Sequence, residues 1–209
     1  MTEADRRPIA ARSLRPVMAA AGWLVRCRAS PDAISVIGMV AALLAGALFA
    51  ATPGRGAVAR LLWLLGALLV QTRLMANLLD GMVAIGRGVA SSAGELFNEI
   101  PDRVSDTAVL VGLGWAAGHP ALGLWAALAA MATAYVRTVG RGLGLPSDFS
   151  GPMAKQHRMA VVTALAVACG VLPAGWTAGW PTVALWIIAV GAFLTTIRRL
   201  VRIARRLRV

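Results

Sequence analysis

The sequence has few of the side chains on which several common kinds of site depend. Its 209 residues include two cysteines, two histidines, one tyrosine and nine acidic residues. Cys27 and Cys169 belong to no CxxC or Cys/His cluster, so both are interpreted as inert, small apolar residues. Charged residues make up 14% of the chain and hydrophobic residues 58%, with a mean hydropathy of +0.72. These values exclude an ordinary soluble domain and a disordered chain.

The apolar residues predict an all-α integral membrane protein. A bilayer-spanning helix needs roughly 20 apolar residues, so six helices would use about 120 positions, close to the apolar fraction of the chain. Clusters of glycine and proline, such as TPGRG, GHP and LPAGWTAGWP, separate the apolar runs. We expect six transmembrane helices near 32–51, 59–83, 96–118, 121–142, 157–173 and 182–201.

The distribution of basic residues supports this map. With six spans, 19 of the 21 basic residues fall on one side of the membrane, and only Arg55 and Arg60 fall on the other. By the positive-inside rule, both termini are expected in the cytoplasm. The basic residues are spread over four membrane-flanking segments without a recognisable binding motif, so no nucleic-acid partner is expected. The Ala/Arg-rich composition and the lack of an organellar targeting signal favour a bacterial inner membrane.

The chain divides into three expected regions. Residues 9–28 mix arginines with Leu14, Met18 and Trp23 around a proline, which predicts an amphipathic juxtamembrane helix lying in the interface. Ser30-Pro31 suits a helix start, because serine caps helices and proline fits the first turn. Residues 1–31 are therefore expected to form a cytoplasmic N-terminus, residues 32–201 the transmembrane domain, and residues 202–209 a basic cytoplasmic tail.

Acidic residues are concentrated at the expected cytoplasmic ends of the second and third spans. Five of the nine lie within 27 positions: Asp80, Glu95, Glu99, Asp102 and Asp106. Ionisable groups at membrane depth are costly, so a cluster of like charge needs a compensating cation. A bound metal ion is the obvious candidate.

Helical spacing gathers these residues on two faces. An arc of about 100° on the second helix holds Asn77, Asp80, Gly81 and Ala84. A similar arc on the third holds Glu95, Asn98, Glu99, Asp102 and Asp106, although Pro101 is expected to kink or begin that helix. Two such oxygen-rich faces can form a hard-cation site suited to Mg²⁺. Gly81 and Gly94 would let a bulky diphosphate approach the backbone.

At these positions the chain resembles the class I CDP-alcohol phosphatidyltransferases. The run Asn77-Leu-Leu-Asp80-Gly81-Met-Val-Ala84, followed by Gly94, Asn98 and Asp102 at four-residue steps, matches the spacing of their signature. That signature reads Asp-x2-Asp-Gly-x2-Ala-Arg, a short spacer, then Gly-x3-Asp-x3-Asp. Other elements agree in order, with Pro31-Asp-Ala-Ile-Ser35 opening the first span and Tyr135-Val-Arg137 late in the fourth.

The departures from the signature place the chain in a divergent subgroup. Asn77 and Asn98 replace the first and third aspartates of the family, and Ile85 replaces its arginine. Arg87 follows two residues later, Glu95 and Glu99 share the face of the third helix, and Asp106 lies one turn beyond Asp102. A shifted acidic set is one interpretation of this pattern.

The resemblance implies a phospholipid-synthesis transferase. A small alcohol would attack the β-phosphate of CDP-diacylglycerol and release CMP, with one or two Mg²⁺ (or Mn²⁺) ions as cofactors. It assigns the metal to Asn77, Asp80, Asn98 and Asp102, with Asp80 as principal ligand. By family position Asp102 is also the general base, and Asp106 is its rival for that role.

Substrate contacts and partners follow from the same resemblance. It implies that the CDP group binds at Gly81, Ala84, Arg87 and Gly94. It implies that a small alcohol acceptor binds at Arg137, Lys155 and Arg158, with an anionic alcohol such as glycerol phosphate or inositol phosphate as the candidate. A homodimer in contact with membrane lipids is expected.

Other interpretations remain open at this stage. The partners could be reversed, with a CDP-linked alcohol transferred to a diradylglycerol, or the chain could be an inactive relative that binds CDP-lipid. Glu95 and Glu99 could be a solvated helix end, and the basic residues could serve only to orient the chain in the membrane.

Overall fold

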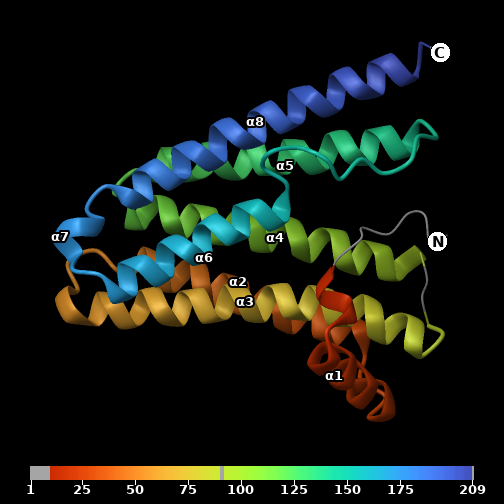
Figure 1. Cartoon of the computed structure of the whole chain (residues 1–209), viewed down its shortest axis with the longest axis horizontal. Helices are drawn as coiled ribbons and strands as arrows, with labels where there is room; N and C mark the ends of the chain where they lie inside the picture. Colours follow the sequence, from red (N-terminus) through yellow and green to blue (C-terminus); the bar gives the residue numbers. More distant parts are fainter. Residues whose placement is uncertain (1–9, 90–91, 209) are drawn as a thin grey trace.

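The computed structural model describes residues 10–89 and 92–208, and these form helices without a strand. Six long helices run side by side along the longest axis of the molecule, and the short α1 lies beside them (Figure 1). The elements in order are η2 (Ala10–Ser13), α1 (Arg15–Arg26), α2 (Pro31–Ala50), α3 (Gly56–Gly86), α4 (Ser92–Ala116), α5 (Pro120–Gly142), α6 (Lys155–Val171), α7 (Ala174–Thr177) and α8 (Trp180–Arg206).

Helix boundaries follow the local signals in the sequence. Ser30 caps α2 by accepting a hydrogen bond from the Ala33 amide at 3.4 Å, and proline stands at the first turn of α2, α5 and α8. Gly118 and Gly179 adopt positive φ at the turns before α5 and α8.

The long helices differ from the predicted spans mainly at their ends. Pro101 lies inside α4, which begins at Ser92, so the helix does not start at this proline. α8 continues to Arg206, past the boundary at residue 201 that divides the expected transmembrane domain from the tail. The short α7 was not predicted from the sequence.

Four segments of the described chain are long and apolar enough to cross a membrane: α2, α3, α5 and Ala174–Arg206, which joins α7 to α8. α6 falls short because it has 17 residues. α4 falls short because it carries four charged residues, Glu99, Asp102, Arg103 and Asp106. The chain is thus a membrane protein whose α4 is polar at one end.

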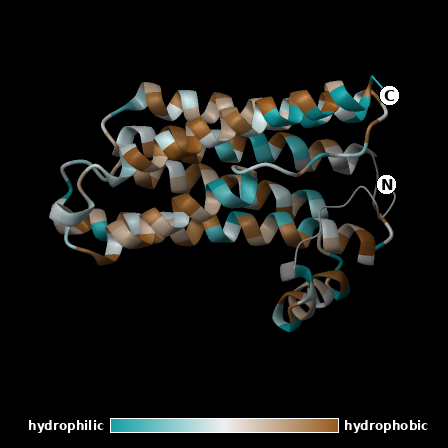
Figure 2. Cartoon of the chain, turned by 45° about the horizontal axis from the view of Figure 1, so that its top comes forward, coloured by the Kyte–Doolittle hydropathy of each residue, from teal (hydrophilic) through white to brown (hydrophobic). Residues whose placement is uncertain are grey.

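Polar residues gather at one end of the bundle. Figure 2 shows hydrophilic colour concentrated toward the end where α8 finishes, whereas the opposite half is largely hydrophobic. α2 packs against both α3 and α4, α3 also against α6, and α5 against α4 and α8. The C-terminal half of α3 and the N-terminal half of α4 therefore meet at the polar end.

Close backbone contact between α2 and α4 holds this arrangement. An ideal Cβ on Gly46 would lie 2.3 Å from the Ala108 carbonyl oxygen, and one on Gly112 would lie 2.1 Å from the Gly46 carbonyl oxygen. Only glycine lets the two helices approach this closely, as at interfaces of small residues in other membrane proteins.

We predict that Gly112→Ala destabilises the protein by about 1–3 kcal/mol, because the added methyl group forces α2 and α4 apart. Thermal unfolding in detergent would measure the effect. Gly142→Ala is a matched control, since a Cβ there meets nothing within 4 Å and its φ is ordinary. Equal midpoints for the two variants would contradict the proposed backbone contact.

Candidate active site

A cavity of about 700 Å³ lies at the polar end of the bundle. Its walls come from the start of α2, the last turns of α3, the first half of α4, the end of α5, the connection after α5, the start of α6, and Arg199 of α8. The residues that form it are therefore widely separated in sequence.

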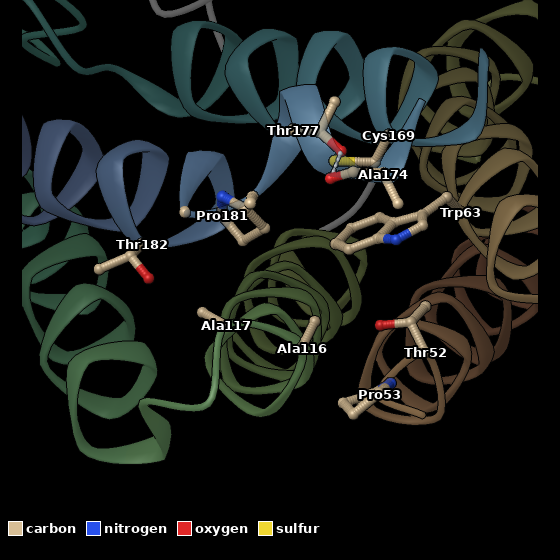
Figure 3. A pocket seen from close by; sticks show the side chains of 12 residues that line it. Thr52, Pro53, Trp63, Ala116, Ala117, Cys169, Ala174, Thr177, Pro181 and Thr182 are labelled. Carbon is tan, nitrogen blue, oxygen red and sulfur yellow. Dashed lines mark hydrogen bonds between the residues drawn. The ribbon is translucent and has the colours of Figure 1, made fainter. Parts of the chain in front are cut away.

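A second cavity of about 230 Å³ lies at the other end and differs in chemistry. Figure 3 shows Thr52, Pro53, Trp63, Cys169, Thr177 and their neighbours around it. None of its lining residues is charged. It therefore offers no counter-charge for a phosphate group, and the larger cavity is the candidate active site.

Asp80 stands on the α3 wall with 3% of its surface exposed. Its carboxylate accepts hydrogen bonds of 2.5 Å from the Ser35 hydroxyl of α2 and from the Gly81 amide. A Cβ on Gly81 would meet no atom within 4 Å, so this glycine borders open space rather than a neighbouring helix. Asp80 is thus oriented by neutral donors beside an open stretch of cavity wall.

Asp102 stands on the facing α4 wall and is surrounded by cations. Its Oδ1 accepts hydrogen bonds from Arg73 of α3 and, at 2.5 Å, from the Lys155 ammonium group of α6. Arg103 lies 3.5 Å from Oδ2. Buried ion pairs with additional hydrogen bonds fix the orientation of both partners, and removing one partner is strongly destabilising.

Asp106 lies one turn further along α4 and does not line the cavity. It is 4% exposed, and its Oδ2 accepts a 2.7 Å hydrogen bond from Arg158. Arg158, only 1% exposed, also donates to the Met153 carbonyl oxygen at 2.9 Å. This pair joins α4 to the start of α6 behind the cavity wall.

Arg137 lines the cavity from the α5 side. Its guanidinium group pairs with Glu99 of α4 and lies 5.2 Å from the centre of the Phe149 ring. Phe149 belongs to the connection between α5 and α6. Glu99 is the more exposed partner, with 42% of its side chain accessible.

The connection between α5 and α6 is fastened to α8. Arg199 donates to the Ser150 and Thr133 carbonyl oxygens at 3.0 and 2.7 Å, and Arg202 lies 3.1 Å from Asp148. Burial opposes ionisation of Asp148, but hydrogen bonds from Ser150 and the charges of Arg202 and Arg199 hold the pKa of this carboxyl below its usual range. The fastening therefore stays charged at neutral pH.

Basic residues outnumber acidic ones in the cavity wall by eight to four. The basic residues are Arg12, Arg87, Arg103, Arg137, Arg141, Lys155, Arg158 and Arg199. The acidic ones are Asp32, Asp80, Glu99 and Asp102. An excess of positive charge inside a partly enclosed space favours a polyanionic ligand.

The structure brings most of the sequence-predicted site residues to this one cavity. Those that line it are Asn77, Asp80, Gly81, Ala84, Arg87, Gly94, Asp102, Arg137, Lys155 and Arg158. The side chains of Asn98 and Glu95 lie outside the described residues. Asp106 is separated from the cavity, and Arg87 donates to the Ala29 carbonyl oxygen at 2.7 Å.

Sequence reasoning overlooked Arg73 and Ser35 as contributors to the site. Arg73 precedes Asn77 by four positions and Asp80 by seven, so helical periodicity already put it on the same face of α3. Ser35 ends the Pro31-Asp-Ala-Ile-Ser35 run, but its contact with Asp80 depends on how α2 packs against α3.

Comparison with known proteins identifies the family. No protein-family model matches the chain. The phosphatidylinositol phosphate synthase of Mycobacteroides abscessus is 30% identical over 189 residues, covering 86% of this chain and 80% of that protein. The chain belongs to the CDP-alcohol phosphatidyltransferase family. The synthase of Mycolicibacterium smegmatis is likewise 30% identical to this phosphatidyltransferase, over 198 residues, covering 88% and 81% of the two chains.

A solved structure shows the same fold. The phosphatidylinositol phosphate synthase of Mycobacterium tuberculosis with CDP-DAG bound aligns with this phosphatidyltransferase at a TM-score of 0.74 and 24% identity, covering 91% of this chain and 94% of that one. A crystal structure of the same synthase in complex with manganese and citrate gives a TM-score of 0.73, covering 90% and 88%. The phosphatidyltransferase is a membrane transferase of phospholipid synthesis.

The buried Arg158–Asp106 pair gives a prediction about stability. Asp106→Asn should destabilise the phosphatidyltransferase by about 3–5 kcal/mol, because it leaves a buried guanidinium group without its counter-charge. The double variant with Arg158→Met should lose less than the sum of the two single losses, as measured by thermal unfolding in detergent. Strict additivity would show that the two side chains do not interact.

Proposed function

We propose that this chain transfers a phosphatidyl group from CDP-diacylglycerol to a hydroxyl group of inositol phosphate and releases CMP. The main observation behind this proposal is that one cavity is lined both by two buried carboxylates, Asp80 and Asp102, and by an excess of basic residues. Such a wall suits two anionic substrates, a diphosphate and a phosphorylated alcohol. The relatives named above support both substrates.

The nucleotide side of the reaction is assigned to α3 and the start of α4. Gly81, Ala84 and Gly94 offer a wall of small residues against which a diphosphate fits, and Arg87 supplies a nearby positive charge. Asp80 fits a divalent cation, because hard cations prefer oxygen ligands and this carboxylate is fixed by neutral donors only. Asn77 and Asn98 add amide oxygens as further ligands, and the ion, when bound, neutralises charge on the diphosphate.

Asp102 is proposed as the general base. The acceptor hydroxyl oxygen forms a bond to the β-phosphorus, the bond from that phosphorus to the CMP oxygen breaks, and the hydroxyl proton passes to the Asp102 carboxylate. Arg73 and Lys155 keep this carboxylate ionised and oriented at the cavity wall. Asp106 is less suited, because Arg158 engages it behind the wall.

Arg137 and Lys155 are proposed to bind the phosphate of the acceptor. Both line the cavity near Asp102, and the Phe149 ring lies against the Arg137 guanidinium group, which pairs with Glu99. Arg158 also lines the cavity, and Asp106 and the Met153 carbonyl oxygen hold its guanidinium group in place. The acceptor hydroxyl would then lie between its own phosphate site and the proposed base.

The proposed membrane arrangement uses all six long helices. α4 and α6 are proposed to cross the membrane together with the four apolar segments described above. The active site and both termini would then lie on the cytoplasmic side of a bacterial inner membrane. α1 is proposed to lie in the interface, since the apolar side chains of Met18 and Trp23, and of Leu14 just before the helix, are more than half exposed. A homodimer is proposed on the family resemblance.

The reaction is tested by measuring CMP release from CDP-diacylglycerol by the purified protein in detergent. We predict release that requires both inositol phosphate and a divalent cation, and that Arg137→Gln lowers kcat/KM by about tenfold or more, because one charge-assisted phosphate contact is lost. Arg55→Gln, at the opposite end, is the control. CDP-lipid binding without release would instead favour an inactive relative.

Glu99 gives a second prediction, about affinity for the acceptor. Since Glu99 occupies the Arg137 guanidinium group, Glu99→Gln should lower KM for inositol phosphate about two- to fivefold, in line with a partly exposed ion pair. Steady-state kinetics with varied acceptor would measure this change. Neutral inositol is the matched control, because its KM should not fall. An unchanged KM for the phosphorylated acceptor would remove Glu99 as a competitor.

A further inference from the structure

The two buried carboxylates of the site have opposite surroundings. Asp102 is hydrogen-bonded by Arg73 and Lys155, with Arg103 close by. Asp80 forms no ion pair with any side chain that the structure describes, and Ser35 and Gly81 are its donors. Asp102 is therefore paired directly with cations of the protein, whereas Asp80 is held by neutral donors and feels the charge of Arg73 without pairing with it.

Arg73 is built into the packing rather than placed at the surface. Its side chain is 3% exposed, and its Nε donates to the Ser105 hydroxyl of α4 at 2.9 Å. A Cβ on Gly38 of α2 would come within 3.1 Å of the Arg73 guanidinium group. Three helices thus make room for a buried cation and aim it at Asp102.

Charge balance then limits the number of metal ions. Arg73 and Lys155 bring two positive charges to the single carboxylate of Asp102, and Arg103 adds a third cation 3.5 Å away, so the surroundings of Asp102 are cationic before any metal binds. A divalent cation bound to Asp102 would face Arg73 and Lys155 at close range, where unscreened repulsion is large. One divalent ion at Asp80 exceeds the charge of that carboxylate, and the positive charge left over suits a diphosphate.

We propose that this phosphatidyltransferase binds a single divalent cation, at Asp80, and that Arg73 supplies the positive charge beside Asp102 in place of a second ion. The inference rests on the proposed function, since it concerns the same site. Arg73 is a positioning residue that acts through Asp102. Asparagine rather than aspartate at positions 77 and 98 accords with a single ion, because an amide side chain adds no negative charge for a second ion to balance.

The test counts Mn²⁺ bound to the full chain in detergent by electron paramagnetic resonance, with CDP present at saturation. We expect about one Mn²⁺ per chain and no spin-coupled pair. Asp80→Asn should lose the ion, and Asp102→Asn should keep it. Two ions per wild-type chain, or loss of the ion in Asp102→Asn, would overturn the proposal.

The role of Arg73 is tested with two variants. Arg73→Lys keeps the charge and should bind one Mn²⁺, whereas Arg73→Gln leaves the Asp102 charge less compensated and should bind a second. Equal counts in the two variants would overturn the role assigned to Arg73. The wild-type count needs no variant, so it decides the number of ions even if Arg73→Gln does not fold.

The count also separates this proposal from the proposed function, because it uses CDP and needs no turnover. One Mn²⁺ per chain with no CMP release from any acceptor would leave the single-ion site standing and reject the transferase. CMP release with inositol phosphate, together with two Mn²⁺ per chain, would support the transferase and reject the single-ion site.

Discussion

Neutralisation of buried carboxylates by buried cations is the interaction on which the polar end of this bundle depends. An isolated charge in an apolar bundle is costly, and one partner left alone is costlier than the pair. Arg73 binds Asp102 across α3 and α4, and Arg158 binds Asp106 across α4 and α6. These pairs fix the helices that form the cavity, so the forces that stabilise the fold also orient the groups assigned to chemistry.

Helix packing in the apolar half decides which polar groups can meet. Gly46 and Gly112 bring the backbones of α2 and α4 into contact, and Gly38 leaves space for the Arg73 guanidinium group. With α2 held this close, the Ser35 hydroxyl reaches Asp80 on α3. A hydroxyl donor at that position orients the carboxylate without cancelling its charge. The site thus depends on glycines that lie well outside the family signature.

Much of this arrangement could be predicted from the sequence, for identifiable reasons. Proline and glycine marked the helix ends, and the 3.6-residue period put Asn77 and Asp80 on one face of α3. Periodicity within one helix does not reveal partners on another. Asp102 and Asp106 share a face of α4, but their surroundings depend on how α6 packs against it. Asp102 lines the cavity and pairs with Lys155, whereas Asp106 is buried away from the cavity and pairs with Arg158.

The departures from the family signature are best understood as changes in charge rather than as losses of single ligands. Asparagine at positions 77 and 98 is uncharged where the signature has aspartate, and Arg73 places a buried positive charge beside Asp102. A smaller set of carboxylates needs fewer compensating cations, and Arg73 is one that the protein itself supplies. The pairing of Arg73 with Asp102 therefore argues against decay of the site, because a decaying site has no reason to retain a buried cation aimed at its remaining aspartate.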